Sequence, residues 1–270
     1  MSRSSPPGLP LGFVPRVEKT AQQLTIVHGS QAVPWIMLDL DAAERFTREN
    51  TTASMIFPSG RVITTSTIHD HKLRAYHLER ETEVVKAFRP ALHIPCDRPV
   101  YAEENPEGRA WFIDSMVHST LLLRDELRGT GTCLVPLVKG IDTSEWIRSF
   151  SPLIHEGFPG FAFYVKQYFG AGLGKRDLGM VHDVRGVIST CGMPYLLLVG
   201  YQSETRRSEL PPAVKAFAGH RWRSFCNVGK VSTITSRRLL EELVNSWHTE
   251  PVTRQDILRQ ETSVALVEGE

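Results

Sequence analysis

Short apolar runs rich in β-branched residues alternate with longer amphipathic stretches along most of this chain. From about Pro90 onward the pattern runs strand, helix, strand, helix, which favours parallel strands joined by crossover helices. Several short runs are almost continuously hydrophobic, as expected of strands that are covered on both faces. The alternation therefore predicts an α/β fold, either a closed (β/α)8 barrel of the TIM type or an open doubly wound sheet.

Length and strand number favour the barrel. α/β barrels often reach roughly 250 residues as one domain, and this chain has 270 residues. No GxGxxG follows the first strand candidate, so the usual dinucleotide-binding signature is absent. We expect a flexible tail at residues 1–20, one barrel domain at 21–250 and a helix or tail at 251–270. The strand candidates are Gln23–Val27, Trp35–Leu38, Ala53–Phe57, Ala91–Pro95, Cys133–Val138, Phe161–Val165, Tyr195–Val199 and Arg223–Val228.

The helix candidates place charged residues between apolar positions at helical spacing. Asp142 is an expected N-cap of one of them, and Gly192 is an expected stop of another. These helices are His71–Phe88, Ala110–Leu127, Thr143–Ile154, Leu178–Thr190 and Ser236–Trp247.

Charge and composition exclude few partners. With 31 basic and 30 acidic residues the net charge is +1, so no global field attracts nucleic acid or a membrane, although a local basic patch would suffice for nucleic acid. No apolar run reaches about 18 residues and the N-terminus lacks an apolar signal core, so we expect a cytoplasmic protein. The cysteines are widely spaced, which favours buried thiols over a disulfide or zinc framework; they are Cys96, Cys133, Cys191 and Cys226.

The reaction centre of such a barrel lies at the carboxyl ends of its strands. Asp97 is the best single candidate, because it follows a strand and its carboxylate can accept hydrogen bonds from a bound base or transfer a proton. A salt bridge with Arg98 or a turn cap is the alternative role. Lys139 could bind a phosphate or a carbonyl, and Gly140 would let a ligand approach the backbone; the alternative is an ordinary loop before a helix.

Three further segments have both a functional and a structural interpretation. Ser59-Gly60-Arg61 could present N–H groups to an anion, or is simply a turn. His69-Asp70-His71 looks like a ligand set, but alternating residues point apart and Asp70 could cap a helix, so we expect no metal. Residues 170–176 are glycine-rich and basic without being a Walker loop, and are either a phosphate-contacting loop or a surface loop. The expected nucleic-acid contacts are Lys175, Arg176, Arg221 and Arg223.

Several segments resemble, in order, motifs of the tRNA-guanine transglycosylase superfamily, and most closely its short branch proposed to insert deazapurines into DNA. Pro90–Asp97 is similar to that family's strand ending in a base-recognising Asp, Leu134–Gly140 to its strand ending in Gln-Gly, and Pro194–Gly200 to its seventh strand. Phe57–Gly60 resembles its acidic-Ser-Gly turn, and Gly157–Ala162 its base-binding glycine segment. The likeness covers roughly Ala53 to Trp247.

The resemblance implies a (β/α)8 barrel that exchanges guanine for a 7-deazaguanine base, a glycosyltransferase of the pentosyltransferase class. Its reaction proceeds through a covalent aspartyl–sugar intermediate on an extruded nucleotide. Asp97 would read the base, and the late segment Ser224–Asn227 has no acid where the family has its nucleophile, so Asp39 or Asp41 is the expected carboxylate. The missing zinc cysteines favour DNA over tRNA, and no cofactor is implied. The expected base contacts are Ser59, Gly60, Lys139, Gly140, Gly160 and Gln202.

Two departures leave other classes of function open: Pro58 stands where the family has Asp, and Lys139 where it has Gln. The chain could be a non-catalytic subunit that binds a base or nucleic acid and supports partner proteins of a modification system. It could instead be an unrelated barrel enzyme that uses Lys139 on a phosphorylated metabolite. A carboxylate facing Asp97 across the mouth of the barrel would favour the transglycosylase.

Overall fold

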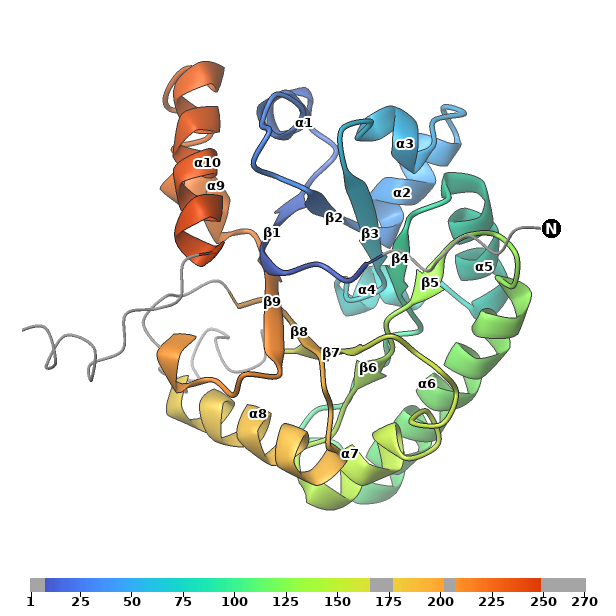
Figure 1. Cartoon of the computed structure of the whole chain (residues 1–270). Helices are drawn as coiled ribbons and strands as arrows, with labels where there is room; N and C mark the ends of the chain where they lie inside the picture. Colours follow the sequence, from blue (N-terminus) through green and yellow to red (C-terminus); the bar gives the residue numbers. More distant parts are fainter. Residues whose placement is uncertain (1–7, 166–176, 202–206, 249–270) are drawn as a thin grey trace, which may run out of the picture.

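The computed structural model describes residues 8–165, 177–201 and 207–248 (Figure 1). Within these ranges the strands form one nine-stranded sheet in the order β5-β4-β3-β2-β1-β9-β8-β7-β6, and every neighbouring pair is parallel. The α/β class is therefore confirmed. The strands are β1 (Gly12–Val17), β2 (Trp35–Asp39), β3 (Arg61–Thr65), β4 (Leu92–Ile94), β5 (Cys133–Leu134), β6 (Leu137–Val138), β7 (Phe161–Tyr164), β8 (Leu196–Val199) and β9 (Val214–Gly219).

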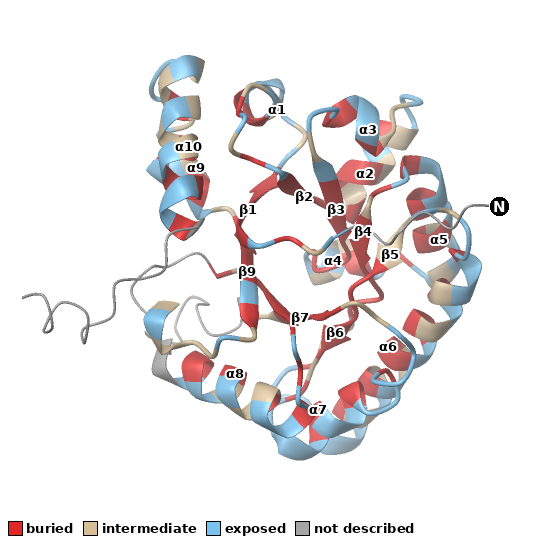
Figure 2. Cartoon of the chain, viewed as in Figure 1, coloured by how far each residue is buried: buried red, intermediate tan, exposed pale blue. Residues whose placement is uncertain are grey.

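Helices lie around the outside of the strands (Figure 1). Their inward faces and the strands are buried, whereas their outer faces are exposed (Figure 2). The α-helices are α1 (Ala21–His28), α2 (Leu40–Thr47), α3 (Ala53–Ile56), α4 (Asp70–Leu73), α5 (Leu78–Phe88), α6 (Pro106–Glu126), α7 (Thr143–Phe150), α8 (Asp177–Cys191), α9 (Arg221–Phe225) and α10 (Thr233–His248).

The two ends of the ladder are consecutive pieces of chain. β5 pairs with β4 and β6 pairs with β7, and only Val135 and Pro136 separate the two strands. Val135 N–H donates to the His93 carbonyl of β4 (2.9 Å), and the Pro136 carbonyl accepts from Ala162 N–H of β7 (2.8 Å). The sheet is thus curled and all-parallel, which is consistent with a TIM-like fold. The expected closure is not present as a regular ladder, because the described β5 and β6 do not pair with each other.

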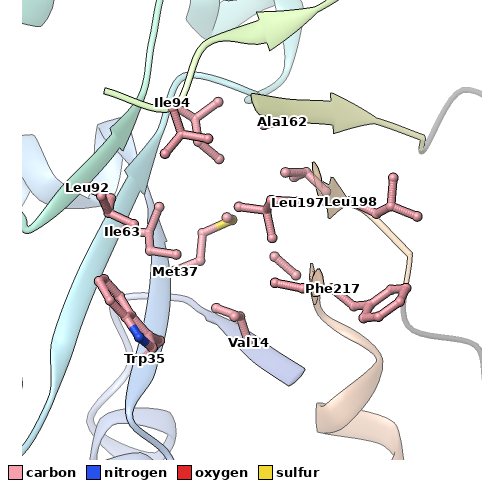
Figure 3. Packing of buried hydrophobic residues seen from close by; sticks show 14 of the residues in the cluster. Val14, Trp35, Met37, Ile63, Leu92, Ile94, Ala162, Leu197, Leu198 and Phe217 are labelled. Carbon is pink, nitrogen blue, oxygen red and sulfur yellow. The ribbon is translucent and has the colours of Figure 1, made fainter. Parts of the chain in front are cut away.

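Side chains from both halves of the sheet fill its interior. Figure 3 shows Met37 of β2 and Ile63 of β3 directed toward Leu197 of β8, and all three are fully buried. The other face of β1 and β9 packs on α10. There the rings of Phe13 and Phe217 lie 5.4 and 4.7 Å from that of Trp247. Since successive strand residues point to opposite faces, these contacts fix which residues of β1 and β9 point inward.

Three of the expected strands are wrong. Gln23–Val27 lies in α1, where the Thr20 hydroxyl caps Gln23 N–H at 3.3 Å and apolar residues at helical spacing bury one face. Ala53–Phe57 lies in and beside α3, and Arg223–Val228 covers the end of α9 and the turn after it. Apolar content predicted strands there, but these segments instead lie in or beside helices whose buried residues face the core.

Three strands replace them: β1, β3 and β9. The predicted tail at residues 1–20 is wrong over Gly12–Val17, because this segment is the central strand β1. It contains Pro15, which cannot donate to a ladder. Residues Gly12 to Pro15 of β1 pair with β9, and the next residues, Arg16 and Val17, pair with β2. The missing N–H therefore falls where the strand changes its partner.

The helix predictions held better. His71–Phe88 is divided into α4 and α5, while the other four lie within α6, α7, α8 and α10 or overlap them. Asp142 caps α7 by accepting Glu145 N–H at 3.0 Å, and Gly192 follows α8 with φ of 63°. The expected segment 251–270 lies outside the described residues. In the described part of the chain, none of the helices has the length and apolarity needed to cross a membrane.

Candidate active site at the carboxyl ends of the strands

An ion pair between β1 and β2 lies at the carboxyl ends of these strands. Arg16 and Asp39 follow inward-facing Val14 and Met37 by two residues, so the pleat directs them inward as well. Arg16 Nε lies 2.6 Å from Asp39 Oδ1, and Arg16 Nη2 donates to the Thr67 carbonyl at 2.6 Å. Arg16 is 5% exposed. The pair thus places a charged layer directly above the apolar interior.

A second ion pair joins the ends of β4 and β6. Lys139 Nζ lies 2.5 Å from Asp97 Oδ1, and Asp97 is 4% exposed. Lys139 directs its hydrogen bond to the Arg98 carbonyl (2.7 Å), so Asp97 Oδ1 has a cation beside it but no well-aligned donor among the described residues. The salt bridge expected as the alternative role of Asp97 exists, but its cation is Lys139 rather than Arg98.

The backbone before Asp97 is fixed by buried polar groups. Ser66 Oγ accepts Asp97 N–H at 2.8 Å. Cys96 has φ of 55°, and its N–H donates to Glu81 Oε1 at 2.9 Å. The same Glu81 oxygen lies 2.8 Å from His93 Nε2. Asp97 is therefore held at its backbone as well as at its carboxylate.

The backbone after Lys139 is fixed in a similar way. Glu145 of α7 accepts Ile141 N–H at 2.9 Å and pairs with Arg109 of α6 at 2.7 Å. Gly140 has φ of 145°, and a Cβ there would come within 2.6 Å of Glu145 Cβ. Packing against α7 therefore requires this glycine, which differs from the expected role of admitting a ligand.

Tyr164 and His220 complete the polar layer. Burial raises the pKa of Tyr164; the charge of Arg16 opposes the shift, while Asp97 and Asp39 add to it. Both carboxylates therefore act on the hydroxyl of one residue at the end of β7. Asp39 and Asp97 thus both lie at carboxyl ends of strands, each paired with its own cation, Arg16 and Lys139.

The titration of two groups is shifted by this setting. Burial raises the pKa of Asp97, and the neighbouring Lys139 opposes that shift. Burial lowers the pKa of His220 to about 4, with Arg16 acting in the same direction and Asp39 against it. His220 is consequently neutral at pH 7, and its buried Nδ1 has no hydrogen-bond partner among the described residues. Strongly shifted groups of this kind are enriched at functional sites.

A groove of about 430 Å³ is lined by Arg98, the residue after Asp97, but not by Asp97 or Lys139 themselves. Aromatic side chains and cations line it together with the carboxylates of Asp70 and Glu104, and the Tyr101 hydroxyl donates to Asp70 at 2.9 Å. Trp111 of α6 is 64% exposed. The groove therefore combines apolar surface with charged side chains next to Arg98.

Three of the expected base contacts lie at the opposite edge of the sheet. Ser59 and Gly60 precede β3, and Gly160 precedes β7, so all three lie at the amino ends of strands. A Cβ would come within 2.1 Å of the Phe57 ring at Gly60 and within 2.4 Å of the Tyr195 ring at Gly160. Their placement contradicts the expected contact with a base read by Asp97, and close packing accounts for both glycines.

Other expected residues lie on the helices. Asp41 is in α2, where Lys72 of α4 lies 2.7 Å from its carboxylate; it is not part of the layer formed by Asp39. Arg223 of α9 pairs with Glu18 at 2.7 Å, and Arg221 is exposed at the start of α9. Lys175, Arg176 and Gln202 lie outside the described residues.

No metal centre is formed by the part of the chain that is described. Nowhere there do three or more His, Cys, Asp or Glu side chains come together as ligands. The rings of His69 and His71 stack with centroids 5.8 Å apart. Asp70 is the first residue of α4 and accepts from Tyr101, so this triplet has a structural role.

Comparison of the sequence with models of known protein families and with curated proteins gives no match. The resemblance to the transglycosylases therefore rests on the motifs in the chain itself.

Sequence reasoning missed several residues of this site. Arg16 lies in the segment expected to be a tail, and His220 follows a strand that was not predicted. Tyr164 lies within the predicted strand Phe161–Val165, and its polar hydroxyl near the carboxyl end was the available signal. Glu81 and Glu145 gave no signal, because a glutamate on a helix is ordinarily exposed.

Proposed function

We propose that the chain is a transglycosylase-like enzyme that exchanges guanine for a 7-deazaguanine base in DNA. One observation carries this proposal. The Asp97 carboxylate and the Lys139 ammonium lie 2.5 Å apart at the strand ends, so a hydrogen-bond acceptor stands beside a donor. The lactam edge of a guanine-type base has the complementary order, a carbonyl oxygen beside N–H donors.

The pair suits such a base in detail. Asp97 Oδ1 lies beside the Lys139 ammonium, and the ring N–H and amino group of the base would donate further hydrogen bonds to this carboxylate. Lys139 would donate to the carbonyl oxygen of the base, as the glutamine does at this place in the family that the chain resembles. Because both side chains are largely buried, these contacts would form at low dielectric, where charge-assisted hydrogen bonds are strong.

Asp39 is the proposed nucleophile. Its oxygen would attack C1′ of the deoxyribose while the bond from C1′ to the guanine nitrogen breaks and the nitrogen keeps the electron pair. The incoming deazaguanine would then lose its ring N–H proton, attack C1′ and release Asp39. The departing guanine nitrogen would take its proton from solvent. Neutral His220, which lies in the field of Asp39, would accept the ring N–H proton of the incoming base and return it to solvent.

We also propose that the sheet acts as a closed (β/α)8 barrel. β5 and β6 would be one strand interrupted at Pro136, since the segment between them bonds to β4 through Val135 and to β7 through Pro136. Counting them together leaves the eight strands of a TIM barrel. The Asp97–Lys139 pair then lies at the mouth, above this interrupted strand.

The proposed partner is DNA with the target nucleotide extruded. The groove beside Arg98 contains Trp111 and Tyr101, on which a neighbouring base would stack. Arg74 and Arg98 form no ion pair with a described carboxylate and would contact phosphates. Asp70 and Glu104 also line the groove, which would restrict phosphates to the arginine side.

One observation favours a second candidate, a non-catalytic subunit that binds the base. β9, the last strand of the described residues, ends at Gly219 and is followed by His220 rather than a carboxylate, and Asp39 is already neutralised by Arg16. A protein with this site would bind a base through Asp97 and Lys139 without exchanging it.

The test is incorporation of a labelled 7-deazaguanine base into DNA, together with equilibrium binding of the free base. Incorporation by the wild type that is lost in Asp97→Ala and Asp39→Asn supports the enzyme. Binding that requires Asp97 without any incorporation supports the subunit. Equal incorporation by the wild type and Asp97→Ala eliminates the role of Asp97, and no binding by the wild type rejects both candidates.

A further inference from the structure

We propose that Glu81 and Glu145 are positioning residues, each of which holds the backbone that presents one member of the Asp97–Lys139 pair. Neither carboxylate touches the pair. Glu81 acts on the residue before Asp97 and Glu145 on the loop after Lys139. The inference deepens the proposed function, because that pair would read the base.

Glu81 reaches the end of β4 from α5 and is 1% exposed. One oxygen, Oε1, accepts both Cys96 N–H at 2.9 Å and the His93 ring nitrogen at 2.8 Å. The other ring nitrogen of His93 lies 2.8 Å from Thr64 Oγ1. This buried chain of hydrogen bonds ties the turn at Cys96 to both β3 and β4.

The turn needs such a tie because Cys96 has φ of 55°, a conformation that residues other than glycine rarely adopt. If Cys96 relaxed to negative φ, the next residue would be redirected and Asp97 would leave Lys139. The bond to Glu81 fixes the peptide plane before Cys96, and the bond from Asp97 N–H to Ser66 Oγ fixes the plane after it, so the two bonds together hold Cys96 in the left-handed conformation.

Glu145 has the equivalent place at the end of β6. It is 7% exposed, pairs with buried Arg109 at 2.7 Å and accepts Ile141 N–H at 2.9 Å. Gly140, between Lys139 and that N–H, has φ of 145°. In both loops, a residue at positive φ lies next to the functional side chain, and a buried glutamate accepts a nearby backbone N–H. In the first loop this is the N–H of Cys96 itself, and in the second it is the N–H of Ile141, which follows Gly140.

The experiment measures how well the ion pair with Asp97 protects the Lys139 amine from acetylation, and it needs no substrate. The full chain is treated with a limiting dose of an amine-acetylating ester, and mass spectrometry gives acetylation of Lys139 relative to Lys86, whose side chain is 41% exposed. The variants are Glu81→Met, which keeps the length but lacks an acceptor, and Glu81→Gln, which retains one. Glu44→Met is the matched control. Glu44 accepts hydrogen bonds from Tyr76 (2.6 Å) and Arg80 (2.7 Å), and this cluster lies away from the strand ends.

We expect Glu81→Met to raise relative Lys139 acetylation about fivefold or more. A residue other than glycine populates the left-handed conformation less than its usual ones by a factor of roughly five to thirty, so Cys96 should leave it once the bond to Glu81 is lost. Glu81→Gln and Glu44→Met should stay within about twofold. Adding Cys96→Gly to Glu81→Met should reverse most of the increase, because glycine adopts positive φ without help.

Equal acetylation in Glu81→Met and Glu44→Met, or no reversal by Cys96→Gly, would overturn the proposal. Should Glu81→Met not fold, Cys96→Val asks the same question with Glu81 intact, because a β-branched residue opposes positive φ. Unchanged Lys139 acetylation in Cys96→Val then rejects it. The expected acetylation differences do not depend on base exchange. If they are observed while base exchange is absent, the proposed function fails but this inference stands.

Discussion

Lys139 Nζ lies 2.5 Å from Asp97 Oδ1, and the two residues follow strands that do not pair with each other. Asp97 follows β4 and Lys139 follows β6, on either side of the break between β5 and β6. The ion pair therefore connects the end strand β6 with β4, the neighbour of the other end strand β5, where regular strand pairing stops. A contact in this position contributes to the architecture as well as to any reaction.

Removing one partner of the Asp97–Lys139 pair should destabilise the fold more than removing both. Lys139→Met leaves the Asp97 carboxylate buried beside no cation, which we expect to cost about 3–5 kcal/mol in the free energy of unfolding. The double variant with Asp97→Asn should be less destabilised than Lys139→Met alone, because no uncompensated charge remains. Urea denaturation of both single variants and the double variant measures the coupling. Additive losses would show that the pair contributes little.

Asp39 and Asp41 provide a matched comparison of two nearby carboxylates. Asp39→Asn should abolish base exchange, a loss of more than about a thousandfold if Asp39 is the nucleophile. Asp41→Asn should change the rate by less than about fivefold, because it weakens only a helix-surface pair with Lys72. The measurement is the rate of labelled base incorporation. Similar rates in the two variants would exclude Asp39 as nucleophile.

Residues at the amino ends of the strands should affect packing without affecting ligand binding. A Cβ at Gly160 would lie 2.4 Å from the Tyr195 ring, so we expect Gly160→Ala to cost about 1–3 kcal/mol of stability. Ser59→Ala should change stability by less than about 0.5 kcal/mol. Neither should alter the Kd for the base in titration calorimetry. A tenfold weaker Kd in Ser59→Ala would return that turn to the site.

His220 should make stability fall on mild acidification. Its pKa is about 4 in the folded chain and about 6.5 when unfolded, so only the unfolded state gains the proton between these values. The contribution is complete above pH 6.5 and is lost as pH falls toward 4, by at most roughly 3 kcal/mol at about 1.36 kcal/mol per pKa unit. Urea denaturation at pH 7.5 and 5 measures the loss.

His220→Gln is the control for this titration, since it lacks the titrating ring. The drop in unfolding free energy between the two pH values should be smaller in the variant than in the wild type. Asp97 does not explain such a difference, because a raised carboxyl pKa stabilises the folded state as pH falls. Equal drops in both proteins would place His220 outside the buried layer.

Hydrophobic alternation predicted the parallel α/β class and the later strands, because β4, β7 and β8 are short apolar runs between long helices. It failed in the first quarter of the chain and again around β9 and α9. β1 contains Gly12 and Pro15, residues that ordinarily argue against a central strand. α1 contains Thr25, Ile26 and Val27, which locally favour a strand. In both cases the pairing partner or the buried face, which lies far away in sequence, decided the outcome.

The positions of the candidate site residues were predicted correctly or wrongly according to whether the strand before them was. The rule that function lies at the carboxyl ends of strands singled out Asp39, Asp97 and Lys139, and the structure places all three at such ends, since their strands were predicted correctly. It misplaced Ser59 because the run before it is α3 rather than a strand. The pairing of Asp97 with Lys139 spans 42 residues, and no local pattern encodes which cation reaches a given carboxylate.

The shortness of β5 and β6 has a consequence for association between molecules. Each has two residues, and each stands at one end of the ladder. Long unpaired edges recruit strands from other copies and start fibrils. Here the polypeptide passes directly from one edge to the other through Pro136, which has no N–H to offer. The fold thus guards itself against edge-to-edge aggregation with a single proline-containing hexapeptide.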